Sequence, residues 1–306
     1  MRLVTISDIE AAAEAISPVV LRTPLLPWGD GQLWLKPENL QPIGAFKIRG
    51  AFNALSRLPE GTNVVAYSSG NHAQAVAYAA KLAGVKATIV VPDNTPQLKI
   101  DATRSHGADV VLVPIGQREA RAEELVEELG AALIPPFDHP DVIAGQGTIG
   151  LEIVADLPDV STVIVPVSGG GLISGIATAV KSLRPGVRVI GVEPELAGDA
   201  AESFRAGELV RWSPQDRART IADGLRAEPS ELTFAHIRKY VDDIVTVSDE
   251  EIGAAVAQIA RRTRIVAEPS GATVVAAYPK VANGKTVGVV SGGNIEPALL
   301  ARLLSS

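Results

Sequence analysis

Residues 163–183 read VIVPVSGGGLISGIATAVKSL, so that an apolar run, three adjacent glycines and an alanine-rich helical pattern follow one another. The apolar run Val163–Val167 lacks alternating polar residues, which is typical of a strand covered on both faces. The pattern over Ile173–Leu183 predicts a helix. A strand that leads through a glycine-rich turn into a helix indicates a parallel sheet with crossover helices, which is an α/β fold.

The same alternation of strand and helix recurs along the chain. A predicted strand, Val187–Val192, follows the first unit directly. Four more strands are each followed by a predicted helix: Val64–Tyr67 with Ala73–Ala83, Ala87–Val91 with Gln97–Ser105, Val110–Val113 with Glu119–Leu129, and Lys285–Val290 with Glu296–Leu303. We therefore expect two α/β lobes built from one continuous chain.

The composition excludes several classes of protein. The 306 residues include no cysteine, which removes disulfides, thiolate metal sites and cysteine nucleophiles. A net charge of −7 argues against a nucleic-acid partner, because binding a phosphate backbone needs clustered lysine and arginine. No apolar run approaches the roughly 20 residues of a membrane span, and the N-terminus lacks the apolar segment of a secretory signal. We expect a cytoplasmic protein that does not contact the membrane.

Lys47 is notable because it is a lysine in an apolar setting. It lies in Gly44-Ala45-Phe46-Lys47-Ile48-Arg49-Gly50, between an aromatic and a branched apolar residue. Burial lowers the pKa of an amine and leaves the neutral nucleophile available for a Schiff base. On this motif alone, a surface lysine on an amphipathic helix remains the alternative.

Three further motifs follow predicted strands and open helices or turns. They are Ser68-Ser69-Gly70-Asn71-His72, Ser168-Gly169-Gly170-Gly171-Leu172 and Ser291-Gly292-Gly293-Asn294. Free backbone N–H groups at a helix N-terminus bind anions, and adjacent glycines let the backbone close around a phosphate. The second motif is neither a Walker loop nor a G-x-G-x-x-G dinucleotide fingerprint. Taken singly, each motif is also compatible with an ordinary helix cap or turn.

Together and in this order, the four motifs resemble those of the fold-type II pyridoxal-phosphate enzymes, most closely the serine racemase and serine/threonine dehydratase (ammonia-lyase) group. The resemblance implies the tryptophan synthase β-like α/β fold, with two lobes of parallel-rich twisted sheets covered by helices. Residues 1–57 and 140–306 would form the large cofactor-binding lobe, and residues 58–139 a small mobile lobe. Because the chain ends soon after residues 291–294, we expect no C-terminal regulatory domain. Further matching stretches are Arg22–Leu25, Val142–Thr148, Ile221–Gly224 and Val241–Ile244.

The resemblance also implies which residues hold pyridoxal 5'-phosphate. Lys47 matches the Schiff-base lysine, Phe46 the aromatic residue against the ring, and Asn71 the amide that bonds the ring hydroxyl. Gly224 matches a position whose backbone lines the ring, and Ser291 the group that faces the pyridine nitrogen. The implied phosphate loop consists of Ser168, Gly169, Gly170, Gly171 and Leu172, in which Ser168 replaces the first of the group's usual four glycines and its hydroxyl would still face the phosphate.

The implied reaction is β-elimination from a β-hydroxy amino acid such as L-threonine or L-serine, giving a 2-oxo acid and ammonia. A neutral serine at position 291 favours elimination over transamination, because it leaves the ring a weaker electron sink than an aspartate would. A serine or other amino-acid racemase, alone or combined with the lyase, and a 3-hydroxyaspartate dehydratase are the alternatives. A cofactor-binding protein without turnover is a further one. The sequence does not rank serine, threonine and hydroxyaspartate as substrates.

The substrate residues implied by the resemblance are Ser68, Ser69, Asn71, His72 and Arg118. In a racemase Ser69 would carry a proton on the face of Cα opposite Lys47, and otherwise it would bind the substrate carboxylate or the phosphate region. For the ring of His72, packing behind the site is the favoured role. Arg118 would favour a substrate with a second carboxylate. Ala227 replaces a serine that often lines the group's substrate pocket, which leaves the substrate side chain open.

A metal site and a homodimer complete the expectations from the resemblance. The spacing of Glu193, Ala197 and Asp199 matches the group's divalent-cation site. Two carboxylates and a backbone carbonyl suit a hard ion such as Mg²⁺, with Ca²⁺ or Mn²⁺ as alternatives. By spacing alone, Glu193 and Asp199 would be interpreted as exposed acids.

Overall fold

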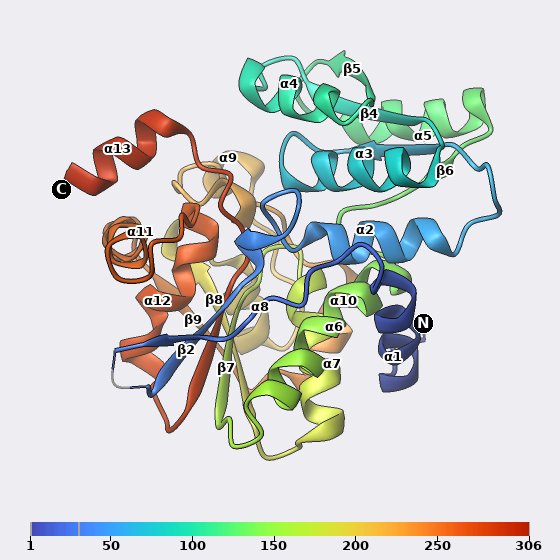
Figure 1. Cartoon of the computed structure of the whole chain (residues 1–306). Coiled ribbons are helices and arrows are strands. Elements are labelled where there is room, and N and C mark those ends of the chain that lie inside the picture. Colours follow the sequence, from blue (N-terminus) through green and yellow to red (C-terminus); the bar gives the residue numbers. More distant parts are fainter. Residues whose placement is uncertain (1, 30, 306) are drawn as a thin grey trace.

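The computed structural model describes residues 2–29 and 31–305, and contains a six-stranded and a four-stranded sheet (Figure 1). Residues 1, 30 and 306, which the predicted large lobe includes, lie outside the described residues. All strand pairs are parallel except the one between the first two strands. The predicted α/β class with parallel-rich sheets is confirmed.

The six-stranded sheet has the order β1-β2-β10-β7-β8-β9. Side chains of alternating residues on its central strands enter two separate cores. Val163 and Val165 pack under the helices α6 (Pro140–Asp156) and α7 (Gly171–Leu183), whereas Ile164 packs under α11 (Asp249–Thr263) and α12 (Pro269–Val281) on the other face. Burial on both faces explains the apolar runs. The strands are β1 (Leu26–Trp28), β2 (Leu33–Pro37), β7 (Thr162–Pro166), β8 (Arg188–Pro194), β9 (Asp243–Val247) and β10 (Thr286–Val290).

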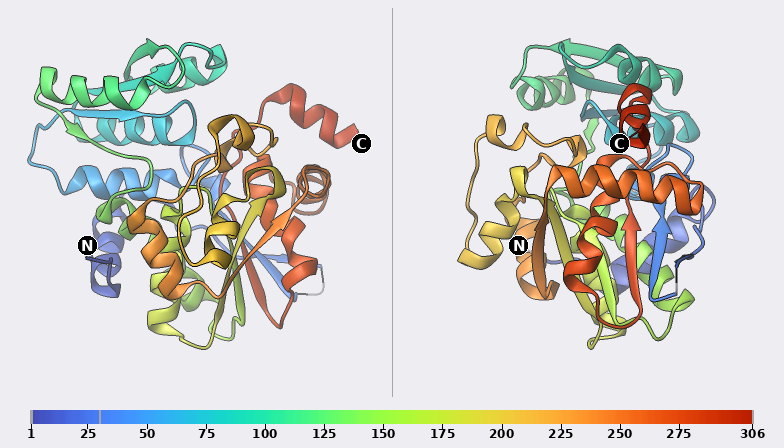
Figure 2. Two further views of the ribbon diagram at one scale, coloured as in Figure 1. Left: turned by 180° about the vertical axis from the view of Figure 1, so that it is seen from behind. Right: turned by 90° about the vertical axis from the view of Figure 1, so that its left-hand side faces the viewer.

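The four-stranded sheet has the order β5-β4-β3-β6. The helices α2 and α3 share a core with one face, and α5 packs on the other face. Figure 2 shows from two further sides that this sheet and its helices lie at one end of the molecule, and the six-stranded sheet at the other. The strands are β3 (Val64–Tyr67), β4 (Ala87–Pro92), β5 (Asp109–Val113) and β6 (Ala132–Leu133). All four fall within the predicted small lobe, whose boundaries and mobility stay predictions.

The helices connect these strands and cover the sheets. They are α1 (Ile6–Ile16), α2 (Lys47–Ser56), α3 (Asn71–Ala83), α4 (Gln97–Ser105), α5 (Arg118–Leu129), α6 (Pro140–Asp156), α7 (Gly171–Leu183), α8 (Asp199–Ala206), α9 (Pro214–Arg217), α10 (Glu231–Tyr240), α11 (Asp249–Thr263), α12 (Pro269–Val281) and α13 (Pro297–Ser305), with short 3-10 turns η1 (Glu38–Leu40), η2 (Glu195–Ala197) and η3 (Asp223–Leu225). Within the described part of the chain, no helix is both long and apolar enough to span a membrane.

Close backbone contacts hold α2 against α6, and α6 against α7. A Cβ on Gly145 would lie 2.5 Å from the carbonyl oxygen of Arg49 on α2. A Cβ on Gly175 of α7 would lie 2.2 Å from the carbonyl oxygen of Ile143 on α6. Both distances are shorter than any side chain tolerates, so glycine is required for these helices to approach so closely. The approach matters because α2 begins at Lys47.

A buried set of charges anchors the same helix. Arg49 donates to Glu38 through Nε at 2.7 Å and to Glu152 of α6 through Nη1 at 2.7 Å. Lys36 forms an ion pair with Glu152 at 2.6 Å. Two cations thus meet two carboxylates in the interior, where a charge without a partner would be costly.

Candidate active site

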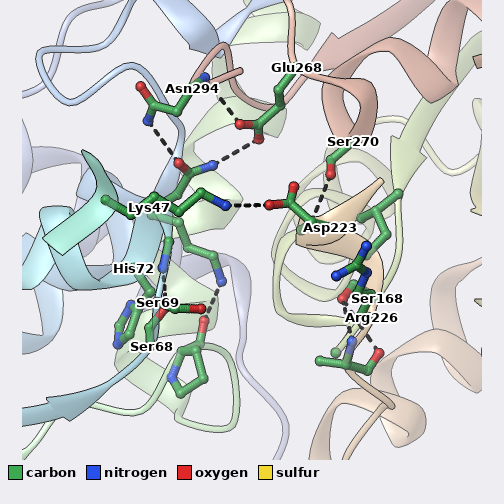
Figure 3. Close-up of a pocket in the computed structure, with 18 of the residues that line it drawn as sticks. Lys47, Ser68, Ser69, His72, Ser168, Asp223, Arg226, Glu268, Ser270 and Asn294 are labelled. Carbon is green, nitrogen blue, oxygen red and sulfur yellow. Dashed lines mark hydrogen bonds and ion pairs between the residues drawn. The ribbon is translucent and has the colours of Figure 1, made fainter. Parts of the chain in front are cut away.

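A cavity of about 1130 Å³ lies between the two sheets. The loops after β3, β7 and β10 line it, which places it at the carboxyl ends of parallel strands, where α/β sheets bind their ligands. Every residue that the sequence analysis assigned to the cofactor or the substrate lines this cavity. The cavity therefore gathers residues from four separate sequence motifs. Figure 3 shows Lys47, Ser68 and Ser69 on one side, and Ser168, Ser270 and Asp223 on the other.

Lys47 reaches the cavity from the first position of α2. Its Nζ donates a hydrogen bond of 2.6 Å to the carbonyl oxygen of Pro136, and lies 5.1 Å from the centre of the Phe46 ring. Burial lowers the pKa of Lys47 to about 8. A substantial fraction of this amine is therefore neutral near physiological pH, which suits a nucleophile and a proton acceptor.

The N-termini of α3 and α7 both open onto the cavity. Asn71 begins α3, and Gly171 begins α7. The first N–H groups of a helix have no partner within it, and the helix dipole adds a partial positive charge. The cavity can thus bind two anionic groups, such as a phosphate and a carboxylate.

The glycines of the loop before α7 are required by close packing. A Cβ on Gly169 would lie 2.4 Å from the Phe137 ring, and a Cβ on Gly170 would lie 2.8 Å from the side chain of Thr233. Ser168 adopts a left-handed backbone conformation (φ 53°) that favours glycine. Its hydroxyl accepts a hydrogen bond of 3.2 Å from the backbone nitrogen of Ala227. The serine hydroxyl thus supports the loop around Gly224.

Ser291 and Gly224 lie on a further wall of the cavity. The carbonyl oxygen of Ser291 accepts a hydrogen bond of 3.0 Å from the backbone nitrogen of Phe46, which ties the end of β10 to the start of α2. The backbone nitrogen of Gly224 donates to the Ser270 hydroxyl at 3.0 Å. Ser68 accepts a hydrogen bond from the backbone nitrogen of Gly70 at 3.2 Å.

The ring of His72 is buried behind these motifs. Its Nε2 lies 2.8 Å from the carbonyl oxygen of Ile134. Burial, aided by the charge of Lys47, lowers the pKa of His72 to about 3. The ring is therefore neutral at physiological pH, and its contact with a carbonyl oxygen makes Nε2 the donor. This position agrees with packing rather than acid catalysis.

Arg118 stands at the edge of the cavity. Its guanidinium lies over the ring of Tyr67 at 6.0 Å, and its Nε donates to Glu119 at 2.8 Å. A second arginine, Arg226, lines the cavity beside Ala227. Its Nε is buried without a hydrogen-bond partner in the described residues. Sequence reasoning did not single out Arg226.

Glu268 is the second residue that sequence reasoning missed. It precedes α12 and is 5 % exposed. Its Oε1 accepts a hydrogen bond of 2.8 Å from Asn71 Nδ2, and its Oε2 accepts one of 3.1 Å from the backbone nitrogen of Asn294. Burial and the charge of Asp223 raise the pKa of Glu268 to about 7. A carboxyl group that titrates near neutrality therefore lies on the cavity wall.

Glu193 and Asp199 lie apart from the cavity, at the end of β8 and the start of α8. Both side chains are buried, contrary to the exposed acids that spacing alone would suggest. Three of their four carboxylate oxygens have no hydrogen-bond partner in the described residues. Burial raises the pKa of Glu193 well above its usual value and that of Asp199 to about 6. Among the described residues, no group of three or more His, Cys, Asp or Glu forms a metal cluster.

Comparisons with known proteins agree with this geometry. A family model described as "Pyridoxal-phosphate dependent enzyme" matches residues 16–293. The L-threonine ammonia-lyase of Thermotoga maritima is 44 % identical over 99 % of this chain and 79 % of its own length. The L-threo-3-hydroxyaspartate ammonia-lyase of Saccharomyces cerevisiae is 43 % identical over 98 % of this chain and 96 % of its own. The structure of maize serine racemase superposes with a TM-score of 0.93 at 38 % identity, covering 99 % of this chain and 98 % of that one.

Proposed function

Because this chain belongs to the family of pyridoxal-phosphate dependent enzymes, we propose that it converts a β-hydroxy amino acid such as L-threonine or L-serine into the corresponding 2-oxo acid and ammonia. The β-hydroxyl is eliminated as water, and the unsaturated amine that forms takes up one water as it releases ammonia, so the net loss is ammonia. The observation that carries the proposal is Lys47, a half-buried amine with a lowered pKa at a cavity that two helix N-termini face. The protein acts as a PLP-dependent ammonia-lyase of the serine/threonine dehydratase type.

The residues of the cavity fit pyridoxal 5'-phosphate. The Lys47 amine would hold it covalently, and the loop from Ser168 to Leu172 at the N-terminus of α7 would bind its phosphate. Phe46, Asn71, Gly224 and Ser291 would surround its ring. When bound, this cofactor withdraws electrons from the substrate Cα and makes its proton acidic.

The chain's own groups then supply binding and proton transfer. Ser68 and Ser69, next to the N-terminus of α3, bind the substrate carboxylate. Once the substrate's α-amino group has replaced it on the cofactor, the freed, neutral Lys47 amine would take the proton from Cα, and the β-hydroxyl would leave with one proton as water. Closure of the proposed small lobe, residues 58–139, would exclude water from the reacting atoms.

Racemisation is the second candidate, supported by the likeness to maize serine racemase. It needs a second proton carrier on the other face of Cα, and the hydroxyl of Ser69 is the candidate. A Ser69→Ala variant would then lose formation of the D-isomer to a much larger extent than it loses elimination, to which Ser69 contributes only by binding the carboxylate.

A substrate with a second carboxylate is a third candidate, supported by the yeast 3-hydroxyaspartate enzyme. Arg118 on the cavity wall would bind that carboxylate; Arg226 also lines the cavity. Arg118→Ala would then lower kcat/KM for 3-hydroxyaspartate by about tenfold to a hundredfold and leave that for L-serine unchanged.

Glu193, Asp199 and the backbone of Ala197 would hold a divalent cation. The unpartnered, buried carboxylate oxygens fit Mg²⁺, Ca²⁺ or Mn²⁺, each of which prefers oxygen ligands. The ion would neutralise two buried carboxylates and fix the turn between β8 and α8. A homodimer in the cytoplasm is also part of the proposal, and sedimentation of the purified protein would test its oligomeric state.

Product analysis by chiral chromatography tests the function. The purified protein with pyridoxal phosphate and Mg²⁺ is given L-serine, L-threonine and L-threo-3-hydroxyaspartate, one at a time. A dominant 2-oxo acid identifies a lyase, and the fastest substrate names it; D-isomer formed at a comparable rate identifies a racemase. Absence of every product, or wild-type turnover by a Lys47→Ala variant, would overturn the proposal.

A further inference from the structure

We propose that Glu268 is a positioning residue: together with Asn294 it fixes the side-chain amide of Asn71 from the opposite side of the cavity, so that an Asn71 N–H faces the bound cofactor. The inference rests on the proposed function, because the role of Asn71 toward the ring hydroxyl belongs to that proposal. It adds a residue that neither the motifs nor the resemblance assigned.

Asn71, Glu268 and Asn294 form a closed set of hydrogen bonds, and Figure 3 labels two of them, Glu268 and Asn294. Asn71 begins α3, which packs on the four-stranded sheet, whereas Glu268 and Asn294 adjoin α12 and β10 on the six-stranded sheet. Asn71 Nδ2 donates to Glu268 Oε1 at 2.8 Å, and Asn71 Oδ1 accepts from Asn294 Nδ2 at 2.8 Å. Asn294 Nδ2 also donates to the carbonyl oxygen of Ile43 at 2.9 Å.

This pattern permits only one orientation of the Asn71 amide. Turning the amide by 180° would place its oxygen against the Glu268 carboxylate and its NH₂ group against the NH₂ group of Asn294. Both contacts would then be repulsive. An amide nitrogen carries two hydrogens, and Glu268 takes one of them. The second remains available to a ligand in the cavity.

Close packing confines the Glu268 carboxyl to this position. A Cβ on Gly292 would lie 2.4 Å from Glu268 Oε1 and 3.0 Å from Asn71 Nδ2. Only glycine at 292 leaves room for the pair to meet. Gly292 directly follows Ser291, so the carboxyl lies next to the residues assigned to the cofactor ring.

The ionised carboxylate is the form that holds Asn71. Both of its oxygens face N–H donors, so a proton on either oxygen would displace one of them. Two charged groups from other elements act on it, Asp223 of η3 and Lys99 of α4, which are themselves paired at 2.5 Å. Asp223 raises the pKa of Glu268, and Lys99 lowers it; the value of about 7 means that the contact forms as pH rises through neutrality.

The test measures binding of pyridoxal phosphate to apoprotein as a function of pH, by the change in its visible absorbance. For the wild type, the Kd should fall in two steps as pH rises, one near 7 from Glu268 and one near 8 from Lys47. Glu268→Gln should remove the step near 7 while it keeps the one near 8, and should raise the Kd at pH 8 by about tenfold, as expected for loss of a charge-assisted hydrogen bond. Melting of each apoprotein, followed by circular dichroism, verifies that the variants are folded.

A matched pair of variants separates positioning from simple closure of the cavity. Lys99→Met and Asp223→Asn each break the same ion pair without touching Asn71. Loss of Lys99 should move the pH midpoint of the Glu268-dependent fall in Kd to a higher value, and loss of Asp223 should move it to a lower value. If the Lys99–Asp223 ion pair acted only by holding the two sides of the cavity together, both variants would change the Kd in the same way.

The outcomes are distinct. If wild-type protein neither binds pyridoxal phosphate nor turns over any of the amino acids, the proposed function fails. If the wild type binds it and is active, but Glu268→Gln retains the step near pH 7, only the role of Glu268 is wrong. Should Glu268→Gln fail to fold, the opposite shifts of the Lys99 and Asp223 variants still decide the question, because equal shifts would contradict the inference.

Discussion

The Nζ atom of Lys47 lies 2.6 Å from the carbonyl oxygen of Pro136. Pro136 belongs to the segment between β6 and α6, so the chain that leaves the four-stranded sheet passes beside the amine. A carbonyl oxygen orients an amine but does not compensate a buried charge as a carboxylate would. Lys47 is therefore held in place while burial still lowers its pKa to about 8.

This relationship predicts how fast apoprotein takes up pyridoxal phosphate at different pH values. Only the neutral amine reacts with a carbonyl group, so the rate should rise with pH up to about 8 and level off above it. Stopped-flow absorbance measures the rate. Lys47→Arg, which keeps the charge and stays protonated, should show no uptake. A wild-type rate that still rises up to pH 10 would mean an ordinary, solvated lysine.

The loop before α7, residues 168–171, predicts a steric clash that a second substitution relieves. In Gly169→Ala the new methyl group would meet the Phe137 ring at 2.4 Å, so the loop must shift. We expect a loss of about 1–3 kcal/mol in the free energy of unfolding and weaker binding of pyridoxal phosphate. Chemical denaturation and absorbance titration measure the two effects.

Two controls accompany the glycine variant. The double variant Gly169→Ala/Phe137→Ala should lose less than the sum of the two single variants, since truncation of the ring makes room for the methyl group. Gly186→Ala should behave as the wild type, because no atom lies within 4 Å of its added Cβ. Additive losses in the double variant would show that the two residues do not compete for space.

The buried pair Glu193 and Asp199 predicts stabilisation by a divalent cation. An ion that binds only the folded protein raises its stability by mass action. The Tm of apoprotein should therefore rise by several degrees when Mg²⁺ replaces a chelator. Asp199→Asn should abolish the difference, whereas Asp159→Asn, which changes an acid paired with Lys285 at the surface, should retain it. Equal melting of wild type with and without Mg²⁺, Ca²⁺ and Mn²⁺ would remove the cation from the proposal.

The sequence predicts the central strands and their helices well, because burial on both faces leaves a local pattern. β3 and α4 have the predicted bounds, Val64–Tyr67 and Gln97–Ser105. Four strands escaped detection: β1, β2, β6 and β9. β1 and β6 have only three and two residues, Lys36 interrupts β2, and β9 (Asp243–Val247) lies at a sheet edge with half-buried positions, so none forms a continuous apolar run.

The cavity residues likewise divide into those that carry a local sequence signal and one that does not. Lys47 and the serine and glycine motifs carry local signals, since helix starts and tight turns restrict residue types. Glu268 carries none: it is a single acid before Pro269, and its partner Asn71 lies 197 positions away. A contact at that separation exists only after the two sheets have come together. Sequence reasoning therefore identified residues that line the cavity, and only the fold brings Glu268 into contact with one of them.

The buried charges beneath α2 predict a large loss of stability from one substitution. Burial raises the pKa of Glu38, but Arg49 and Lys36 outweigh this effect and hold it below the usual value. Arg49→Met would leave Glu38 and Glu152 with Lys36 as the remaining cation of the cluster. We expect a loss of about 3–5 kcal/mol in the free energy of unfolding, measured by chemical denaturation at pH 7.

The pH dependence of that loss identifies its origin. A carboxyl whose pKa is lowered by folding contributes stability above its unfolded pKa, and the contribution disappears as pH falls through the folded value. The gap between wild type and Arg49→Met should therefore narrow as pH falls below about 4.5, the usual pKa of glutamate. Arg121→Met is the control, because its ion pairs with Glu124 and Glu128 lie at the surface and its loss should leave stability unchanged. A gap that stayed constant down to pH 3 would mean that Arg49 stabilises α2 through packing of its side chain rather than through its charge.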